Sequence, residues 1–512
     1  MTVTQQDKLR IAVIGAGPGG LAATINLLRL PFVELSVFDQ ATELREVGAG
    51  ISINQNTWRH LQLLGAAEAI EQYTKRGDGT KIAGEQRNGK TGEVLKRTYQ
   101  SVDPNKPARS RIERYKLQQA LLQQIPQSII QLNKRLASID ESKKEGVVLT
   151  FKDGSVEGPF GLVVGADGIR SAVRQHTFPS HRLSYTGKTA FRTLIPASAV
   201  AHIPNLPPAS TFWHTAKTHV YTDFLDGGLF EIATRAEIAN DPENGREKVS
   251  WGQKVGREDV VGYYDNYCET IRQVIAAPTE WLEFAMFGGP RLESVISNGR
   301  IALLGDASHP LSGAFGSGAA FAFEDAYVLA QALSYTYRQT QSGQGSTKGA
   351  VGEALELYDG VRSPHYKNLV RTVLLPLPHP SCLQLIPPPS PPPPPNFSSS
   401  QEPRADKKEQ YSILNAFSQN TFATAASHPP EVDEDAYIAE TTRRNWTAEN
   451  EWIYTYDVTD VWAGKVRELE KEKEGKEGKE VGESGEKVEG LSVGDVPKEN
   501  VLATPVGVAV EA

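Results

Sequence analysis

Short apolar runs, separated by longer amphipathic stretches, occur between residues 11 and 164 and again from residue 301. Four runs have the length and continuous apolar character of strands buried on both faces. They cover residues 11–14, 35–38, 162–164 and 301–304. Helical patterns follow the first and last of these runs, from about Pro18 to Leu30 and over residues 319–334. Strands that alternate with helices in this way predict an α/β domain built on a parallel sheet.

A different pattern fills the middle of the chain. Residues 185–235 alternate between apolar and polar side chains, and residues 76–108 hold short strand-like runs among Gly, Thr and Lys. A period of two is typical of strands with one buried face. We therefore predict a mostly β domain inserted into the α/β domain.

Smaller elements complete the expected fold. Helices are predicted over residues 114–124 and 258–277, and a loop over residues 45–56 leads into a helix from about Thr57. The run 147–151 is predicted to be a strand, with a turn at residues 152–154 that leads to the strand at 162–164.

Two stretches near the C-terminus have the composition of chains that do not form a compact core. Residues 376–395 contain eleven prolines, which predicts polyproline II structure. Residues 465–490 are rich in Lys, Glu and Gly and nearly lack apolar side chains, so we expect disorder there. Residues 409–463 carry Trp446, Trp452 and Trp462, and are predicted to fold as helices on the main body.

These patterns predict an α/β fold with a Rossmann-like dinucleotide-binding domain, an inserted mostly β domain for the substrate, and a helical C-terminal segment. The dinucleotide-binding domain is discontinuous. The predicted parts are residues 1–75, 109–180 and 291–370 for the dinucleotide domain, 76–108 and 181–290 for the β domain, 371–408 for a proline-rich insertion, 409–463 for the helical segment and 464–512 for a disordered charged tail.

Composition narrows the class of protein. The formal net charge is −8, which leaves no basic footprint for nucleic acid. Only Cys268 and Cys382 are present, which excludes a disulfide framework and a cysteine-based zinc site and fits a reducing, cytoplasmic compartment. The first residues are polar rather than signal-like, and no apolar run reaches the ~18 residues of a membrane span. We expect neither a metal site nor a transmembrane segment.

A glycine-rich turn follows the first buried strand. Gly15, Gly17 and Gly20 are spaced as G-x-G-x-x-G, just before the helix that starts at Pro18. The first glycine permits a tight turn, the second lets a pyrophosphate approach the backbone, and the third lets helix and strand pack closely. Asp39 ends the second strand, where an acidic residue holds a ribose hydroxyl. This order of elements predicts a dinucleotide site.

A second glycine-rich motif follows the strand at 301–304. Asp306 comes directly after that strand, and Gly318 opens the helix that runs through Glu324 and Asp325. The Asp306 carboxylate is placed to bond a polyol hydroxyl, and the helix N-terminus would stabilise negative charge on a reduced flavin ring. Together the two motifs predict FAD as the dinucleotide.

This set of motifs resembles the group A flavoprotein aromatic hydroxylases, and most of all the salicylate-hydroxylase-like FAD-dependent monooxygenases of fungi. The resemblance covers residues 9–370 and 411–463. Besides the two glycine-rich motifs, it rests on Arg114 and on the Asp167-Gly168 pair, which closes the strand at 162–164 before a helix expected near Ile169.

The resemblance implies both a cofactor site and a reaction. The implied FAD contacts are Gly15, Gly17, Gly20, Asp39, Ala49, Gly50, Arg114, Asp167, Asp306, Gly318 and Ala319. NAD(P)H would bind transiently and reduce FAD, and O2 would then form a hydroperoxyflavin that transfers oxygen to an electron-rich aromatic ring. The implied partner is a small aromatic molecule from secondary metabolism, and the family is compatible with a homodimer.

Two residues of the predicted β domain are candidates for catalysis. Arg192 lies within a strand where an apolar residue is expected, so a guanidinium there needs an anion to pair with. Similar enzymes that hydroxylate phenols use an arginine in this strand and a tyrosine nearby, which points to Tyr221. The family often has Tyr-Pro before the Gly-Gly of this sheet, whereas Asp223-Phe224 stands here.

Several residues keep a second interpretation. Asp306 is either a flavin ligand or only a helix-capping acid, and Arg114 is either an FAD contact or a surface charge. His309 is either a catalytic base or, as is more common, a histidine that bonds the backbone of its own loop. The same fold also serves FAD reductases or dehydrogenases that make no oxygenated product, and a non-catalytic flavoprotein is the alternative outside enzymes.

The proline-rich stretch admits two explanations. The resemblance breaks off after Val370 and resumes near Tyr411, and residues 371–400 are mostly Pro, Leu, Ser and Phe, whose codons are largely pyrimidine. A retained intron that is read in frame would have this composition, and so would a genuine proline-rich linker. The sequence of the mature transcript decides between them.

Overall fold

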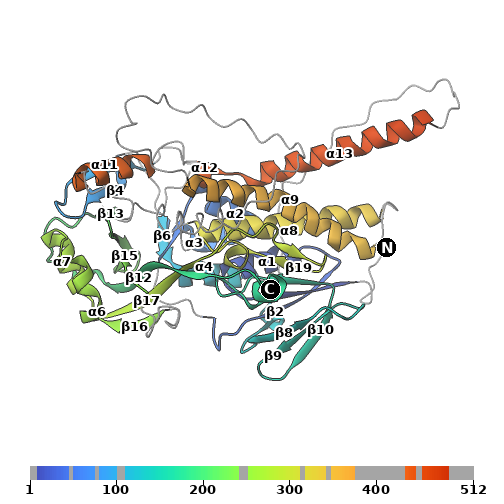
Figure 1. The fold of residues 1–512 in the computed structure, drawn as a ribbon, viewed down its shortest axis with the longest axis horizontal. Coiled ribbons are helices and arrows are strands. Elements are labelled where there is room, and N and C mark those ends of the chain that lie inside the picture. Colours follow the sequence, from blue (N-terminus) through green and yellow to red (C-terminus); the bar gives the residue numbers. More distant parts are fainter. Residues whose placement is uncertain are drawn as a thin grey trace, which may run out of the picture. The chain divides into compact units, whose positions relative to one another are not determined.

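The computed structural model describes nine segments of the chain. They are residues 8–44, 50–74, 80–100, 110–240, 252–311, 317–341, 347–374, 433–445 and 452–483. Figure 1 shows a sheet covered by long helices and a second, larger sheet that lies beside it.

The first sheet is the predicted parallel sheet. Its strands are β1 (Leu9–Ile14), β2 (Val33–Phe38), β7 (Ile130–Gln131), β11 (Leu162–Gly165), β18 (Ile296–Ser297) and β19 (Ile301–Leu303). They are ordered β18-β19-β11-β1-β2-β7, and every neighbouring pair is parallel except β18 with β19. The two glycine-rich motifs follow β1 and β19, so this order brings them to the same edge of the sheet with only β11 between their strands.

Helices pack around this sheet. They are α1 (Pro18–Leu28), α2 (Gln55–Leu64), α3 (Ala67–Glu71), α4 (Arg114–Leu122), α5 (Ala172–Thr177), α8 (Gly318–Gln341) and α9 (Thr347–Leu374). Helix α8 contacts α1, α2 and α9 along its length. Its Phe321, Phe323 and Leu329 are fully buried although they lie on different sides of the helix, because other elements surround α8.

The second sheet has eight strands and belongs to the predicted β domain. They are β4 (Ile82–Asn88), β5 (Val94–Tyr99), β12 (Ser184–Pro196), β13 (Ser210–His214), β14 (His219–Leu225), β15 (Leu229–Glu237), β16 (Gln253–Gly256) and β17 (Glu280–Gly288). Their order is β16-β17-β12-β15-β14-β13-β4-β5, and the pairs are antiparallel except β13 with β4.

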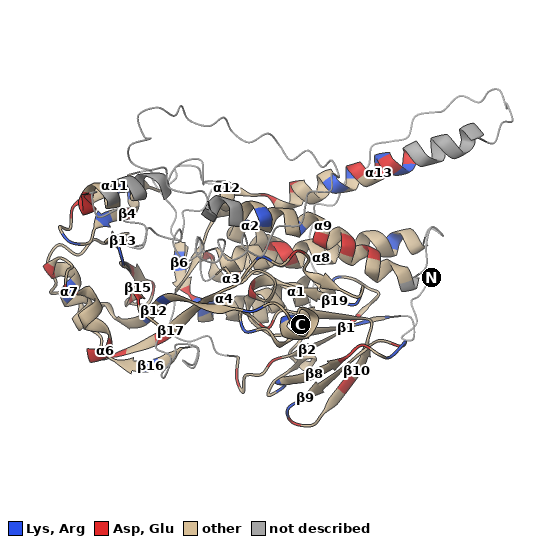
Figure 2. Ribbon diagram, in the orientation of Figure 1, with Lys and Arg blue, Asp and Glu red and all other residues tan. Residues whose placement is uncertain are grey.

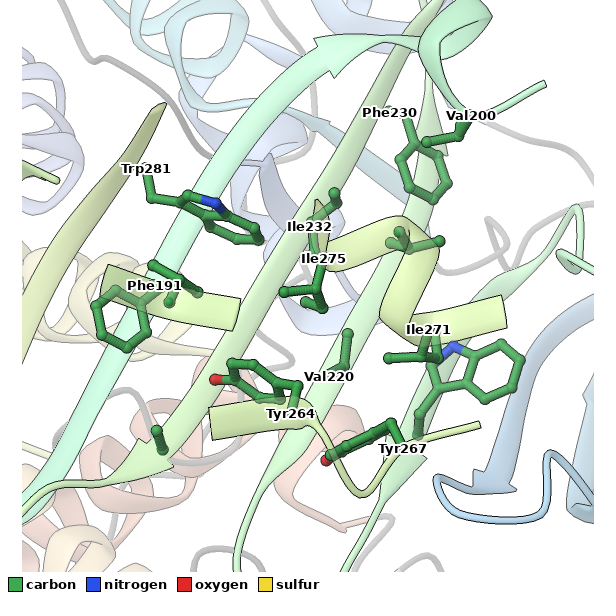
Figure 3. Packing of buried hydrophobic residues seen from close by; sticks show 14 of the residues in the cluster. Phe191, Val200, Val220, Phe230, Ile232, Tyr264, Tyr267, Ile271, Ile275 and Trp281 are labelled. Carbon is green, nitrogen blue, oxygen red and sulfur yellow. The ribbon is translucent and has the colours of Figure 1, made fainter. Parts of the chain in front are cut away.

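One face of the eight-stranded sheet is the core of this domain. Phe191, Val220, Ile232 and Trp281 alternate with polar residues along their strands and pack against α6 (Glu258–Val261), η5 (Gly262–Tyr264) and α7 (Glu269–Ala276). Figure 3 shows their rings and branched chains interleaved with Tyr264 and Ile271 from the helices. The opposite face of the sheet is therefore the one left for polar side chains.

Two small sheets complete the described part of the chain. Strands β3 (Gly50–Ile53) and β6 (Ser110–Glu113) pair antiparallel, and so do β8 (Leu136–Asp140), β9 (Val147–Phe151) and β10 (Val156–Phe160). The prediction of a loop over 45–56 was therefore wrong for residues 50–53, since their partner lies far along the chain. The turn at residues 152–154 was predicted to lead to the strand at 162–164. It leads instead to β10, which pairs with β9, so this prediction was wrong.

The C-terminal helices are α11 (Glu434–Asn445), α12 (Trp452–Thr455) and α13 (Val458–Glu483). The expectation of disorder from residue 464 was wrong as far as Glu483. In the coloured part of α13, positive and negative side chains lie close together (Figure 2), and the pair of Lys465 with Glu468, 3.1 Å apart, supports the helix beyond its buried Trp462. The proline-rich stretch lies outside the described residues beyond Leu374, where α9 ends.

Both sheets belong to one compact unit that ends at Trp462. The residue boundaries between a dinucleotide domain and a substrate domain therefore stay a prediction. Within the described segments, none of the helices combines the length and apolar character needed to cross a membrane.

Candidate active site

The first glycine-rich turn has the shape of a phosphate site. Gly15 has φ of +104°, and a Cβ atom there would lie 2.4 Å from the Ala166 carbonyl oxygen. A Cβ on Gly20 would lie 1.8 Å from the Gly15 carbonyl oxygen, so both positions require glycine. Gly17 precedes α1, and no atom lies within 4 Å of its Cβ position. Open space at a helix N-terminus fits a pyrophosphate.

Asp39, directly after β2, accepts a hydrogen bond from the backbone of this turn. Its Oδ2 accepts the backbone N–H of Ala16 at 2.6 Å, and its Oδ1 accepts that of Ala41 at 2.7 Å. Each carboxylate oxygen has a further lone pair that a ribose hydroxyl could use. The position therefore fits the predicted ribose contact as well as a structural one.

Asp306 is the one exposed residue in a run of buried neighbours from residue 301 to 311. It lies in η6 (Gly305–Ala307), directly after β19. The Cβ position of Gly318, the first residue of α8, is 3.8 Å from its Oδ1. None of the described residues donates a hydrogen bond to this carboxylate. A carboxylate that is available beside a helix N-terminus fits a ligand with hydroxyl donors, as the polyol chain of FAD has.

Asp167 caps a helix, and its predicted contact with FAD stays a prediction. Its carboxylate accepts the N–H groups of Ala172 and Val173 and the Ser171 hydroxyl. These bonds cap α5, which begins at Ala172 rather than near Ile169. The helix starts later because Gly168 takes φ of +76°, a conformation that a helix cannot include. Ala49, another implied contact, lies outside the described residues.

Behind Asp306 lies a buried cluster of charges that sequence analysis missed. Asp325 Oδ2 accepts the Gly305 N–H at 2.9 Å and pairs with His309 Nε2 at 2.9 Å. Asp325 Oδ1 accepts from Arg362 Nε at 2.7 Å and also from the Tyr366 hydroxyl. The cluster thus fixes the backbone of the turn that carries Asp306. The only signal in the sequence was an acidic pair within an otherwise apolar helix.

Glu324 completes this cluster. Its Oε2 accepts from Arg362 Nη2 at 2.9 Å, and its Oε1 accepts from Asn56 Nδ2 at 3.3 Å. Burial raises the pKa of Glu324 to about 7 despite Arg362. For Asp325 the opposite holds, because Arg362 and His309 outweigh burial and lower the pKa. His309 therefore bonds a carboxylate. The expectation that it bonds the backbone of its own loop was wrong.

The two-stranded sheet β3-β6 connects the cofactor side to the eight-stranded sheet. Gly50 in β3 donates its N–H to Glu231 Oε1 in β15 at 2.9 Å. Arg111 in β6 donates to both Glu231 oxygens and, at 2.9 Å, to the Ser52 hydroxyl. Although burial opposes its charge, Glu231 keeps the pKa of Arg111 above its usual value. Arg114 follows at the start of α4, so Gly50 and Arg114 lie at this junction.

The polar face of the eight-stranded sheet carries both candidate catalytic residues. Arg192 in β12 and Tyr221 in β14 each pair with Ala233 of the intervening strand β15, so they lie in one row. The Arg192 guanidinium carbon is 5.4 Å from the centre of the Phe284 ring. Arg111 stacks on the Tyr221 ring at 4.7 Å, and the Tyr221 hydroxyl donates to Asp223 Oδ2 at 2.7 Å.

In the described part of the chain, no group of three or more His, Cys, Asp or Glu side chains is placed to hold a metal ion. Free space at Gly17, the available Asp306 carboxylate and the α8 N-terminus lie at one edge of the first sheet. The polar sheet face with Arg192 lies across the β3-β6 junction.

Comparison with known proteins identifies the group to which these features belong. A family model described as an FAD binding domain matches residues 8–372. The chain is 31% identical over 379 residues to a 3-amino-4-hydroxybenzoate 2-monooxygenase from Streptomyces platensis, covering 72% of this chain and 88% of the relative. It is 28% identical over 378 residues to a salicylate hydroxylase from Pseudomonas putida, covering 70% and 82%.

The solved structures agree on the fold. A salicylate hydroxylase in complex with its substrate superposes with a TM-score of 0.63 at 22% identity, covering 89% of this chain and 97% of that one. The α/β fold predicted from the sequence and FAD as the cofactor are confirmed. The chain belongs to the family of FAD-dependent monooxygenases that hydroxylate aromatic compounds.

Proposed function

We propose that this enzyme hydroxylates an aromatic substrate whose carboxylate or phenolate oxygen is held by Arg192. The observation that carries this proposal is the environment of Arg192 on the polar sheet face. The side chain is partly buried, and burial together with Arg114 lowers its pKa to about 10, so it still carries its charge near neutral pH. No carboxylate of a described residue lies within 4 Å of its guanidinium. An anionic ligand would supply the missing partner.

Tyr221 is proposed to position Arg111 rather than to bind the substrate oxygen directly. Its hydroxyl is directed to Asp223, and its ring supports the Arg111 guanidinium. Arg111 in turn holds Glu231, the residue that anchors Gly50 of β3. The chain Tyr221, Arg111, Glu231 would therefore set how closely the substrate face approaches the cofactor.

The cofactor would be held by the residues at the edge of the first sheet. We propose that the Gly15–Gly20 turn binds the pyrophosphate, Asp39 the ribose, Asp306 the polyol chain, and the Gly318-Ala319 end of α8 the flavin ring. When bound, FAD supplies electron transfer from NAD(P)H and the activation of O2. The protein orients the aromatic ring, excludes water from it, and holds its acidic oxygen in the ionised form through Arg192.

A screen of phenols and aromatic acids tests the reaction. Substrates should stimulate both NAD(P)H oxidation and oxygen uptake, and mass spectrometry should show one added oxygen atom in the product. A reductase of the same fold would oxidise NAD(P)H without adding oxygen to the compound. A non-catalytic flavoprotein would not respond to any of the compounds.

Replacing Arg192 tests the anchor. Arg192→Lys and Arg192→Ala should both lower kcat/KM by about ten- to a hundredfold, because an ammonium does not reproduce the guanidinium fork. Flavin content should stay normal, since no cofactor-binding residue changes. Arg272→Ala, on the exposed surface of α7, is the control and should leave kcat/KM unchanged. Wild-type kinetics in Arg192→Ala would reject the proposed role.

Three further expectations remain part of the proposal. The enzyme would use either NADH or NADPH as reductant, work in the cytoplasm, and assemble as a homodimer if the family pattern holds. Kinetics with each nucleotide, fractionation of cells and the mass of the enzyme in solution test them separately.

A further inference from the structure

Beyond Arg192, the polar face of the eight-stranded sheet carries two more cations. Along β12 the side chains of Arg192, Ala190 and Lys188 point to the same face, because side chains alternate along a strand. Ala190 pairs with Arg235 of β15, and Lys188 pairs with Glu237. Along this face, Glu231 lies on one side of Arg192, and Lys188 and Arg235 lie on the other side. Glu231 contacts the β3-β6 junction, so the two cations lie farther from that junction than Arg192 does.

Lys188 is unusual because it is buried, and Glu237 attracts it only from beyond ion-pair distance. Its exposed fraction is 7%, and none of the described residues forms a hydrogen bond or ion pair with its ammonium group. Glu237 is its cross-strand neighbour, yet the two groups are not within ion-pair distance. A buried cation without a partner is costly, and folded proteins rarely keep one without a use for it.

The charges on this face do not balance. The Glu231 carboxylate is engaged by Arg111. Burial keeps the pKa of His219, which pairs with Arg235 across the strands, well below its usual value, so this ring stays neutral. Glu237 is the remaining acid beside Lys188, and burial raises its pKa. Among the described residues of this face, the end of the sheet that is remote from the cofactor therefore carries two cations, Lys188 and Arg235, and one acid, Glu237.

We propose that Lys188 and Arg235 form a second anion subsite, which binds a remote acidic group of an elongated aromatic substrate. The inference rests on the proposed function, because Arg192 would hold the acid next to the reacting ring. Four residues of strand separate Arg192 from Lys188, a span of about 13 Å between their Cα atoms. That span suits a ring with one acidic group at Arg192 and a second carboxylate on a short arm.

Solvent reaches this end of the sheet. Glu237 lines an open groove of about 290 Å³ together with Lys217, Thr218 and Tyr263. A carboxylate arm that extends from the ring toward this groove would keep part of its hydration, and Lys188 and Arg235 would replace the rest. A compact substrate such as salicylate would leave the subsite empty.

Three probes separate the subsite from the ring site in the full-length holoenzyme. Salicylate tests the ring site alone, 5-(2-carboxyethyl)salicylate adds a charged arm, and 5-(2-carbamoylethyl)salicylate has a neutral arm of the same shape. Binding is measured from the change in the flavin absorption spectrum, and turnover from the mass of the product. The variants are Lys188→Met, which keeps the length of the side chain, and Lys152→Met, an exposed control in the turn between β9 and β10 that removes the same charge away from this sheet.

In wild-type enzyme the charged arm should bind about tenfold more tightly than the neutral arm, as one charge-assisted bond provides. Lys188→Met should reduce this ratio to about twofold or less, whereas Lys152→Met should keep it. Salicylate should bind all three proteins equally. Equal binding of the two armed compounds to wild type would overturn the subsite. If salicylate also failed to bind or to stimulate oxygen uptake, the proposed function itself would be at fault.

The preference for the charged arm over the neutral arm should also weaken as the pH rises. Burial and Arg235 lower the pKa of Lys188 to about 7, so its charge is lost as the pH rises through that value. The ratio of affinities for the charged and neutral arms should fall between about pH 6 and about pH 9 in wild type. Burial and Arg192 lower the pKa of Arg235 to about 9, so in Lys188→Met the ratio should stay flat up to about pH 8. A ratio that did not change with pH in wild type would contradict the role of Lys188.

Discussion

Replacing Arg362 with alanine is expected to lower the free energy of unfolding by about 3–5 kcal/mol, more than any other single change considered for this protein. Arg362 is fully buried and donates to Asp325 at 2.7 Å and to Glu324 at 2.9 Å. Without it, two carboxylates remain in the interior without their cation. Urea denaturation of the variant and the wild type, followed by tryptophan fluorescence, measures the difference.

A matched ion pair on the surface provides the control. Arg272 pairs with Glu269 on α7, where both side chains are at least half exposed. Arg272→Ala should change the free energy of unfolding by less than about 1 kcal/mol, because exposed pairs contribute little. If Arg362→Ala were as mild as this control, the buried cluster would not be a main source of stability.

The cluster also joins parts of the chain that are far apart in sequence. Asn56 of α2 bonds Glu324 and donates to the Ile453 carbonyl oxygen at 3.4 Å. Arg59 pairs with Asp457 at 3.1 Å. The C-terminal segment is thereby tied to the helices that hold the turn with Asp306. We expect Arg362→Ala to weaken flavin retention as well, since Asp325 would no longer be held in place behind Gly305.

The features that could be predicted from the sequence are those whose residues lie close together along the chain. The strand at 11–14, its three glycines and Asp39 lie within thirty residues, and their order already indicates a dinucleotide site. The alternation around Phe191 predicted correctly that one face of β12 belongs to a core. The expectation of an apolar residue at position 192 was wrong, because Arg192 follows Phe191 in the strand and therefore lies on the opposite, polar face of the sheet.

What could not be predicted depends on partners distant in sequence. Strand β3 exists because β6, some sixty residues later, pairs with it. The burial of Lys188 follows from how β12 and β15 sit together, and a lysine in a strand is by itself ordinary. The part of α13 that was expected to be disordered is helical through charge pairs, which a count of apolar residues does not register.

Asp306→Ala is expected to raise the dissociation constant for FAD by about ten- to a hundredfold, the size of one charge-assisted hydrogen bond to a buried ligand. The Asp306 side chain is exposed, and described residues give its carboxylate no hydrogen bond. Its loss should therefore leave the protein without FAD as stable as before, within about 0.5 kcal/mol. Titration of the apoprotein with FAD, followed by quenching of flavin fluorescence, gives the dissociation constant.

Two further variants make this prediction specific to the carboxylate of Asp306. Asp306→Asn keeps an oxygen acceptor without the charge, so its affinity for FAD should fall between those of wild type and Asp306→Ala. Asp226→Ala removes a carboxylate that is 53% exposed and that, among the described residues, pairs with Lys116 at 3.3 Å, and it should bind FAD normally. Because no described residue donates a hydrogen bond to the Asp306 carboxylate, a loss of affinity at unchanged stability would indicate that the carboxylate contacts the cofactor. Wild-type affinity in Asp306→Ala would instead assign the second glycine-rich motif a role in the fold alone.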